Sequence, residues 1–379
     1  MNSQGFKNNK VFVGLSGGVD SAVSVALLKM TGYDVTGVFI KVWQPEWIIC
    51  NWKEERRDAM RVAARLNIPF ITLDLEKEYK ESVIDNMIAE YQNGQTPNPD
   101  IMCNREVKFG AFWRFARSRG ANYIATGHYA RIFVKLGVGS DPKKHAPNIY
   151  ELHIGKDINK DQSYFLWTLN QEDLVHVIFP VGQLTKTEVR KLARKLKLPN
   201  ADKKDSQGLC FMGKVDVNDF LSHYVKTEPG NVLNEHGEII GRHPGALFFT
   251  IGERHGFTIV NKTSDERRYY VVDKDMEQNS ITVSNRVANI GLGNASRKVR
   301  IMNVNWIRGS AWDLTVCGQY EYPFQARIRY RQPLRKIKIL SINIGETTVE
   351  FEGPIDSPTP GQSLVIYDGN ECIGGGIIV

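Results

Sequence analysis

Small and polar residues that could bind phosphate lie near the start of the chain. Residues 10–21, KVFVGLSGGVDS, place them between two apolar stretches. The glycines let backbone N–H groups turn toward an anion, and Ser16 and Ser21 add hydroxyl donors. A helix starting at Val19 would add its positive N-terminal end. The pattern predicts a loop that binds the phosphates of a nucleotide.

The loop lacks the lysine that a Walker A motif uses to reach the β- and γ-phosphates. Asp20 stands near the end of the loop instead. A carboxylate suits a bare phosphate poorly, but it suits a magnesium ion that bridges phosphates. We therefore expect Mg²⁺ at Asp20 and cleavage that releases pyrophosphate, rather than transfer of a γ-phosphoryl group.

Two further segments place a cysteine beside polar residues. In GQTPNPDIMCNREVKFG, residues 94–110, Pro97 and Pro99 should exclude helix, which would leave Asn98, Asp100 and Cys103 on a loop before a basic helix. In DSQGLCF, residues 205–211, Cys210 opens an apolar segment. Taken singly, both segments have plainer interpretations. The first is a turn capped by Asn104 with a passive cysteine, and the second is a buried strand cysteine.

The chain has five cysteines, an odd number widely spread, which argues against a secreted disulfide scaffold. No CxxC pair occurs, and the histidines do not recur at metal-ligand spacing, so we predict no zinc and no metal centre other than the Mg²⁺ that comes with the nucleotide. The remaining cysteines, Cys50, Cys317 and Cys372, are expected to be inert and buried.

Strand and helix patterns alternate over the first 200 or so residues. KVFVG, DVTGVFI, IPFITLDL and NYIATGHYA read as strands, and helical spacing follows Val19 and covers 54–66, 75–91 and about 105–119. This alternation predicts a doubly wound parallel sheet. GLSGGVDS and TGHYAR each lie just past a strand, so both should face one site at the carboxyl edge of the sheet. The segment 42–58 is less regular, and we assign it no role.

The pattern changes after about residue 200. Residues 214–285 contain one short helix, around DVNDFLSHY, among Gly-rich turns and short strands such as RYYVVDKD and SITVS. From about 289 onward the pattern is all β, typical of a small barrel. We therefore expect an α/β chain in three domains: a parallel-sheet domain over 1–213, a small central domain over 214–288 and a C-terminal β-barrel over 289–379.

The 379 residues are 42% hydrophobic and 24% charged, with a net charge of +7, which is ordinary for a soluble globular protein. No apolar run is long enough to span a bilayer and no secretory signal is present, so we expect a cytoplasmic protein with no membrane partner. Basic residues gather in RIRYRQPLRKIK, residues 327–338. If this is a strand, Arg327, Arg329 and Arg331 share one face, either as a nucleic-acid surface or as a merely solvated one.

The string SGGVDS, following a strand and opening a helix, resembles the PP-loop of the N-type ATP pyrophosphatases, a superfamily that activates a carbonyl or carboxylate by adenylation. The loop, NPDIMCN, TGHYAR, KDQSYFLW and DSQGLCF together resemble the tRNA-uridine 2-sulfurtransferase (tRNA-specific 2-thiouridylase) family. So do PGNVLNEHGEIIGRHPGALFFTIGERHGF, RIRYRQ and TPGQSLVIYDG. The resemblance covers essentially the whole chain.

The resemblance implies an activity. ATP adenylates the C2 carbonyl oxygen of U34, the wobble uridine, a cysteine persulfide delivers sulfur to C2, and AMP leaves. The cofactors implied are ATP with Mg²⁺. The partners are tRNA, those for Lys, Glu and Gln, and a sulfur donor, which is either a relay protein or a cysteine desulfurase.

The same resemblance assigns residues to these roles. Cys210 carries the persulfide, Cys103 assists release of sulfur and ends in a disulfide with Cys210, and Asp100 is the acid/base residue. ATP is bound by Gly14, Leu15, Ser16, Gly17, Gly18, Val19, Asp20, Ser21, Ile40 and Gly127. The target base and tRNA are contacted by Asn98, Pro99, Asp100, His128, Lys160, Asp161, Gln162, Arg329, Tyr330 and Gln362.

Elementary chemistry agrees with these roles. A carbonyl oxygen is a poor leaving group but departs readily as an AMP ester, and a thiolate or persulfide is a good nucleophile near neutral pH. A carrying and a resolving cysteine allow reset by reduction. His128 could instead be a structural histidine. Tyr164, Phe165 and Trp167 are expected to pack in the core.

Two other functions compete with this one. The runner-up is another PP-loop AMP-forming ligase or amidotransferase that acts on a small molecule, which would need neither cysteine nor the Arg-rich segment. The third is an RNA-binding protein without catalysis, against which the intact loop, Asp100 and both cysteines count.

Overall fold

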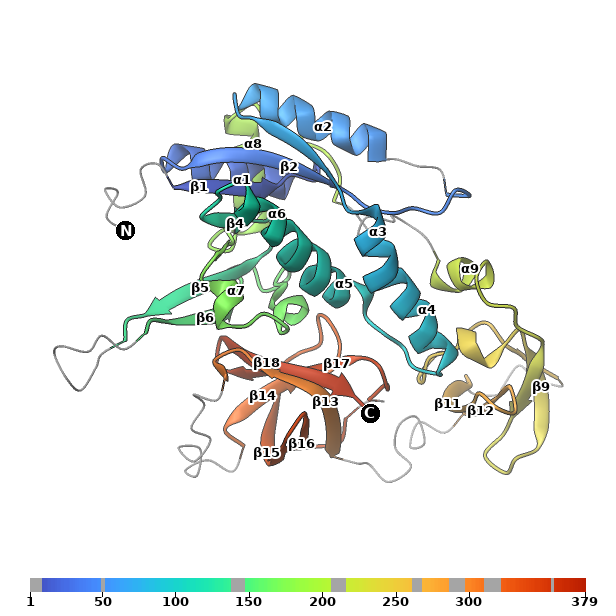
Figure 1. Ribbon diagram of the computed structural model, residues 1–379. Coiled ribbons are helices and arrows are strands. Elements are labelled where there is room, and N and C mark those ends of the chain that lie inside the picture. Colours follow the sequence, from blue (N-terminus) through green and yellow to red (C-terminus); the bar gives the residue numbers. More distant parts are fainter. Residues whose placement is uncertain are drawn as a thin grey trace.

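The computed structural model describes residues 9–48, 52–137, 147–205, 216–260, 268–285, 297–309, 322–355 and 358–379 (Figure 1). Cys50, Cys210 and Cys317 lie outside these ranges. Among the described residues, no helix has the length and apolar character required to cross a membrane.

The first domain is built on a five-stranded parallel sheet in the order β3-β2-β1-β4-β7, which confirms the predicted doubly wound α/β fold. Its strands are β1 (Lys10–Gly14), β2 (Asp34–Lys41), β3 (Phe70–Asp74), β4 (Tyr123–Ala125) and β7 (Val177–Ile178). Because β1 is buried on both faces, its residues Val11, Phe12 and Val13 are all apolar. The hydrophobic pattern of the sequence therefore predicted this sheet correctly.

Helices cover both faces of this sheet. One apolar cluster joins the sheet to α1 (Val19–Met30), α2 (Trp52–Arg65) and α8 (Lys186–Lys195). The second cluster lies on the other face and joins it to the long helical run. That run contains α3 (Glu76–Tyr79), η1 (Lys80–Ile84), α4 (Asp85–Gln92), α5 (Pro99–Met102), η2 (Cys103–Ala111) and α6 (Phe112–Ser118). The short elements η3 (Ser163–Leu166) and α7 (Gln171–Leu174) complete the domain.

The expectation that Pro97 and Pro99 exclude helix is wrong for Pro99. The α-helix α5 begins at Pro99, with Asn98 as its N-cap, and Asn98 Oδ1 accepts a hydrogen bond from the Asp100 N–H at 3.2 Å. Proline is favoured at the first helical position, because its missing N–H has no intrahelical partner there. Asp100 and Cys103 are therefore on a helix and not on a loop, and Asn104 lies inside η2 instead of capping it.

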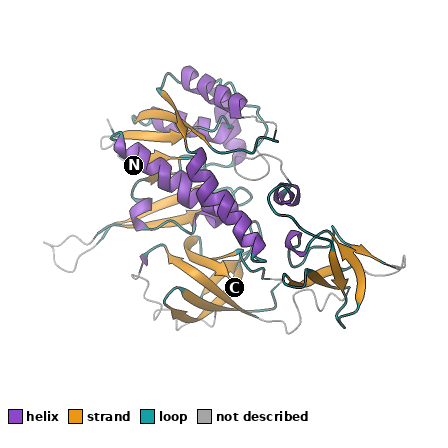
Figure 2. Cartoon of the chain, turned by 45° about the vertical axis from the view of Figure 1, so that its right-hand side comes forward, coloured by secondary structure: helices purple, strands orange, loops and turns teal. Residues whose placement is uncertain are grey.

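In the residues that the structure describes, the central domain is a small five-stranded sheet with one short α-helix, as the sequence indicates, and one 3-10 turn (Figure 2). Its elements are α9 (Val217–Ser222), β8 (Gly230–Leu233), β9 (Ile239–His243), η4 (Ala246–Phe248), β10 (Thr258–Ile259), β11 (Tyr270–Asp275) and β12 (Ser280–Ser284). The C-terminal barrel contains β13 (Lys298–Trp306), β14 (Phe324–Arg327), β15 (Arg335–Asn343), β16 (Glu346–Phe351), β17 (Ser363–Asp368) and β18 (Glu371–Ile378). It closes where β13 pairs with β18.

A hairpin from the first domain extends the barrel sheet. Strand β6 (Ile149–Ile154) pairs with the first residues of β18, Glu371 and Cys372, and β5 (Ala130–Lys135) forms the outer edge. The pairing joins segments more than 200 residues apart. The sequence pattern did not predict it, because the ladder between β6 and β18 has only two residue pairs and no turn connects these strands.

A buried ion pair joins the first domain to the barrel. The Arg327 guanidinium binds the Asp161 carboxylate, and the exposed fractions of the two residues are only 8% and 3%. The other Asp161 contacts come from the Gly155 and Ser163 N–H groups and the Ser163 hydroxyl, at 3.0–3.1 Å. Arg327 also donates to the Tyr367 hydroxyl. Both charges are thus hydrogen-bonded inside the interface.

This ion pair corrects the expected arginine face. Strand β14 ends at Arg327, Ile328 is buried, and Arg331 has a positive φ of 65°. The alternation of an extended strand therefore does not apply to residues 328–331. Arg327, Arg329 and Arg331 are not one solvent-facing row, because Arg327 is needed to balance Asp161.

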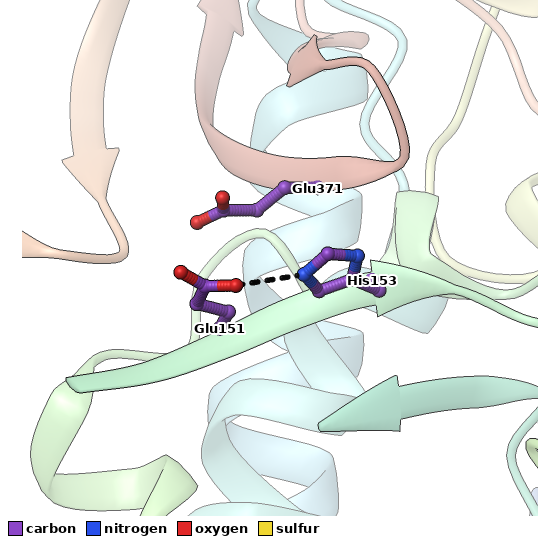
Figure 3. Close-up of side chains that lie close together, drawn as sticks. All are labelled: Glu151, His153 and Glu371. Atoms are coloured by element: carbon purple, nitrogen blue, oxygen red, sulfur yellow. Dashed lines mark hydrogen bonds and ion pairs between the residues drawn. The ribbon is translucent and has the colours of Figure 1, made fainter. Parts of the chain in front are cut away.

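A second charged cluster lies where β6 meets β18. Figure 3 shows the Glu151, His153 and Glu371 side chains gathered together, with Glu151 Oε2 and His153 Nε2 3.1 Å apart. The Arg308 guanidinium binds both glutamates. Burial raises the pKa of Glu371 to about 7, with Arg308 opposing the shift and Glu151 adding to it. Arg308 thus supplies the cation that joins the hairpin to the barrel.

Replacing Asp161 with alanine should destabilise the chain strongly. The change leaves the Arg327 guanidinium buried without its carboxylate, which typically costs about 3–5 kcal/mol. Urea unfolding of the full chain, followed by tryptophan fluorescence, measures this loss. Asp202→Ala is the matched control, since Asp202 pairs with Arg194 on the surface, at exposed side-chain fractions of 77% and 60%, and should change little. Equal effects of the two variants would contradict the role given to Asp161.

Glu371 should make stability depend on pH. Its folded-state pKa of about 7 lies above the ordinary value of 4.5, so the native state keeps a proton that the unfolded chain has lost between those values. This contribution is complete below about pH 4.5 and is lost as pH rises through about 7. The unfolding free energy of wild type, relative to Glu371→Gln, should therefore fall across this range. A difference that stays flat or rises would contradict the assignment.

Candidate active site

The phosphate loop connects β1 to α1 and is held by its own short hydrogen bonds. The Ser21 hydroxyl donates to the Gly18 carbonyl at 3.0 Å, and Ser16 Oγ lies 3.3 Å from Ser21 Oγ. Gly17 has a φ of +80°, and a Cβ there would come 2.5 Å from the Glu55 carbonyl oxygen. Gly18 at the N-cap of α1 has no side chain to cap the helix. The N-terminal N–H groups of α1 are therefore available to an anion.

The cation that the loop motif lacks comes from another helix. Lys186 begins α8, and its Nζ donates to both oxygens of Asp20 at 2.8 Å. The same Nζ lies 2.8 Å from Asp205 Oδ1. Lys186 thus bridges two carboxylates at the mouth of the phosphate loop, and its side chain is only 12% exposed.

Lys186 was not among the residues predicted from the sequence, although a local signal marks its position. Thr185 and Glu188 form a capping box at the start of α8, with Thr185 Oγ1 accepting from the Glu188 N–H. The string TKTEVR therefore shows where the helix begins. It does not show that this helix end lies beside a loop 166 residues earlier, because that contact depends on the parallel sheet.

Asp205 extends the charged network away from the loop. Besides Lys186, its carboxylate binds Lys160 Nζ at 2.7 Å and the Arg190 guanidinium at 2.7 Å. Burial opposes ionisation, but the hydrogen bonds from Lys160 and Lys186 lower the pKa of Asp205 to about 2. Asp205 is thus ionised at neutral pH and held by three cations at the edge of the described residues. Cys210, a few positions later, lies outside them.

The segment TGHY lies against the phosphate loop, as expected from its place after a strand. A Cβ on Gly127 would come 2.8 Å from the Ser21 nitrogen, so only glycine fits at this contact. The Tyr129 hydroxyl donates to Asp20 Oδ1 at 2.6 Å. Burial, followed by the Asp20 charge, raises the pKa of Tyr129 well above its ordinary value. Tyr129, which was not predicted from the sequence, remains a neutral donor to Asp20.

His128 is buried, with an exposed fraction of 7%. Its Nδ1 lies 2.7 Å from Thr126 Oγ1, and the rings of Phe109 and Phe179, which also contact each other, pack against it. Burial lowers the pKa of His128 well below its ordinary value. These contacts agree with the structural alternative and give no support to the expected RNA contact.

Residues 160–162 connect the phosphate loop to the helix that contains Cys103. Gln162 exchanges backbone and side-chain hydrogen bonds with Tyr129 at 2.9 and 3.0 Å. Lys160 is bound to Asp205, and Asp161 is buried against Arg327. Asp161 therefore has a structural role, and its carboxylate is not presented to an RNA. Tyr164 and Trp167, which follow, are buried in the core as expected.

The remaining predicted residues lie on neighbouring elements. Asp100 is half-buried in α5, and Cys103 is fully buried at the start of the π-helical segment η2. The Asn104 amide donates to the Phe165 carbonyl at 3.0 Å, which joins this helix to η3 and hence to residues 160–162. Ile40, at the end of β2, is 7% exposed. Asp20, Tyr129, Gln162 and the helix of Asp100 and Cys103 thus form one connected set.

The three predicted residues from the barrel are half-buried in contacts with the other domains. Tyr330 packs on Phe165, with ring centroids 4.5 Å apart. Arg329 donates to Thr359 Oγ1 at 3.2 Å. The Gln362 amide donates to the Thr96 carbonyl at 2.7 Å. The Arg329 guanidinium also lies 3.5 Å from the Ile251 carbonyl of the central domain, so all three positions lie where the barrel approaches the other two domains.

The residues around Asp20 do not fit a magnesium site on this chain. Both carboxylate oxygens already accept from Lys186, and one also accepts from Tyr129. Among the described residues, the single set of three His, Cys or carboxylate ligands within reach of one another is Glu151, His153 and Glu371, and Arg308 already supplies the cation there. We therefore assign no step to Mg²⁺.

Family models match the three parts of the chain. The model described as tRNA methyl transferase HUP domain matches residues 9–214, tRNA methyl transferase PRC-barrel domain matches 218–285, and Aminomethyltransferase beta-barrel domain matches 296–378. Among solved structures, the U34-tRNA thiolase NcsA from Methanococcus maripaludis covers 51% of this chain and 58% of its own, at 18% identity and a TM-score of 0.34. That likeness is too low to bear on function.

Relatives of known name match almost the full length. The chain is 41% identical over 373 residues to the tRNA-specific 2-thiouridylase MnmA of Geobacillus thermodenitrificans, covering 97% of this chain and 94% of that protein. It is 40% identical over 374 residues to the enzyme of the same name from Bacillus subtilis, covering 98% and 95%. The chain therefore belongs to the tRNA-specific 2-thiouridylase family.

Proposed function

We propose that this chain uses ATP to replace the C2 oxygen of U34 in tRNA with sulfur. The observation that carries the proposal is the connected set around the phosphate loop. Lys186 and Tyr129 bind Asp20, Gln162 binds Tyr129, and η3 contacts the helix of Asp100 and Cys103. Nucleotide chemistry and sulfur chemistry can thus meet within one continuous part of the fold. The three domains proposed, 1–213, 214–288 and 289–379, would all contact the tRNA.

The first step proposed is adenylation of the base. The C2 carbonyl oxygen attacks the α-phosphorus, the α–β phosphoanhydride bond breaks, and pyrophosphate leaves. The α1 N-terminus and the Gly17–Gly18 backbone would hold the phosphates. Lys186, which lies beside the loop on Asp20, would also donate a charge-assisted hydrogen bond to the incoming phosphates.

The second step proposed is sulfur transfer. The terminal sulfur of a Cys210 persulfide attacks C2, the C2–O bond breaks, and AMP leaves with the oxygen. The Cys103 thiolate attacks Cys210 Sγ, which breaks the persulfide S–S bond, leaves the sulfur on C2 and forms a Cys103–Cys210 disulfide. Asp100 would move the proton between base and thiol. A dithiol reductant then returns both cysteines to thiols for the next persulfide.

Incubation with ATP, magnesium, a persulfide donor and unmodified tRNA should produce 2-thiouridine, detected by mass spectrometry after digestion. Cys210→Ser and Cys103→Ser should each abolish the product, because neither serine can carry or resolve a persulfide. Cys50→Ser is the matched control and should retain activity. Undiminished thiolation by Cys210→Ser would contradict the proposal. So would AMP formation that needs a small acid and no tRNA, which would indicate a small-molecule ligase.

Lys186→Met should weaken ATP binding and slow pyrophosphate release. The change removes the cation between Asp20 and Asp205, so two carboxylates face the incoming phosphates. Loss of one charge-assisted hydrogen bond, about 1.5–3 kcal/mol, corresponds to roughly a 10- to 150-fold rise in Kd. Calorimetric titration with ATP measures it. Lys195→Met, an exposed lysine at the far end of the same helix, should bind ATP as wild type does. Equal affinity in both variants would show that Lys186 has no role at the phosphates.

A further inference from the structure

The segment that leads into the helix of Asp100 lies where the three domains meet. Residues 93–98 connect the end of α4 to the start of α5. In Figure 1, α4 ends beside β11 and β12 of the central domain, and the connection runs toward the barrel. Pro97 and Pro99 have no N–H, so this backbone offers few donors of its own. Its position therefore depends on what binds its carbonyl groups and its remaining N–H groups.

The barrel binds this segment on both sides of Thr96. The Thr96 N–H donates to the Pro360 carbonyl at 2.9 Å. The Gln362 amide donates to the Thr96 carbonyl at 2.7 Å, and its distance to the Pro97 carbonyl is 3.4 Å. One turn of the barrel, residues 359–362, thus binds both the N–H and the carbonyl group of Thr96. We call this turn the barrel clamp.

Gly361 lets the barrel clamp approach this closely. Its φ is +90°, and a Cβ there would come 2.7 Å from the Thr96 nitrogen and 3.0 Å from Gln95 Cβ. The clamp is fixed in turn to the last strand, since the Gly361 N–H donates to the Ile378 carbonyl at 3.0 Å and the Ile378 N–H donates to the Gln362 carbonyl at 2.8 Å. It is therefore a rigid support rather than a loose loop.

The central domain contacts the same segment. Thr96 Oγ1 lies 3.3 Å from Thr250 Oγ1, and a Cβ on Gly94 would come 2.8 Å from Met276 Cγ. Thr96 is 8% exposed as a result. Arg329 joins the barrel to the central domain. Its guanidinium lies 3.2 Å from Thr359 Oγ1 of the barrel and 3.5 Å from the Ile251 carbonyl of the central domain. The barrel and the central domain, which would both hold the tRNA, therefore both contact residues 94–97.

Movement of residues 96–98 would displace Asp100 and Cys103, because both lie within about one helical turn of Asn98. Asn98 caps α5 through the Asp100 N–H, and Cys103 follows as the C-cap of the same short helix. The start of α5 is therefore set by the position of residues 96–98. Misplacing a catalytic group by about 1 Å can cost on the order of a hundredfold in rate.

We propose that Gln362 and Gly361 are positioning residues: the barrel clamp holds residues 96–98 so that Asp100 and Cys103 meet the base. This rests on the function proposed above for those two residues. It differs from the expectation that Gln362 contacts tRNA, because the Gln362 amide donates to protein carbonyls. Binding of tRNA to the barrel and the central domain would then change the position of Asp100 through the barrel clamp.

Gly361→Ala tests the proposal, with Gly345→Ala as its matched control. Gly345 lies in another turn of the same barrel, with a φ of +74°, and a methyl group added there would have no atom within 4 Å. Both changes thus strain a left-handed position, but only the first pushes on Thr96. We expect kcat for thiolation at saturating tRNA to fall about tenfold or more in Gly361→Ala relative to Gly345→Ala, with the KM for tRNA changed less than about twofold.

Gln362→Leu removes both amide donors without adding bulk against Thr96. It should likewise lower kcat and leave the KM for tRNA nearly unchanged. It also decides the question if Gly361→Ala does not fold. Equal kcat in Gly361→Ala and Gly345→Ala would overturn the proposal. So would a raised KM with unchanged kcat in Gln362→Leu, which would make Gln362 an RNA contact.

Amide hydrogen exchange of residues 98–103 separates this proposal from the proposed function. Exchange there should be faster in Gly361→Ala and Gln362→Leu than in Gly345→Ala, whether or not the wild type thiolates tRNA. If the wild type makes no 2-thiouridine but exchange responds in this way, the function fails and the clamp stands. If thiolation occurs and exchange does not respond, the clamp fails alone.

Discussion

The Lys186 ammonium between Asp20 and Asp205 is the interaction on which the site depends. A phosphate loop that carries a carboxylate would repel the phosphates it must hold, unless a cation balances that charge. Here the cation comes from α8 and not from the loop. The same ammonium holds Asp205, the last described residue before the segment of Cys210. Lys186 therefore joins the phosphate loop to Asp205, and the proposed function would link nucleotide binding to the Cys210 segment through this one ion.

Buried ion pairs hold the barrel against the first domain. Asp161 and Arg327 neutralise each other between the first domain and the barrel, and the Arg308 guanidinium binds both Glu151 and Glu371. Such pairs add modest net stability but penalise any other arrangement of the same elements. The relative position of the domains, and with it the barrel clamp on Thr96, is thereby kept within narrow limits.

Much of the fold could be predicted from local pattern, because β1 and α1 carry clear buried and helical periods around SGGVDS. Pro99 misled the prediction because proline both ends and begins helices, and only the Asn98 cap decides between them. Arg327 was expected on an exposed arginine face, either binding nucleic acid or merely solvated, because its partner Asp161 lies 166 residues away. Lys186 was missed for the same reason. The sequence identified residue types that could do chemistry, but non-local charge pairing decided which of them are placed to do it.

The proposed chemistry requires that the base itself, through its C2 oxygen, is the group that the phosphate loop adenylates. The most direct measurement follows that oxygen. A tRNA labelled with heavy oxygen at C2 of U34 is thiolated in a single turnover, and AMP, pyrophosphate and water are analysed by mass spectrometry. Adenylation at C2 predicts that the label appears in the phosphate of AMP and nowhere else. Label released to water, or found in pyrophosphate, would contradict it.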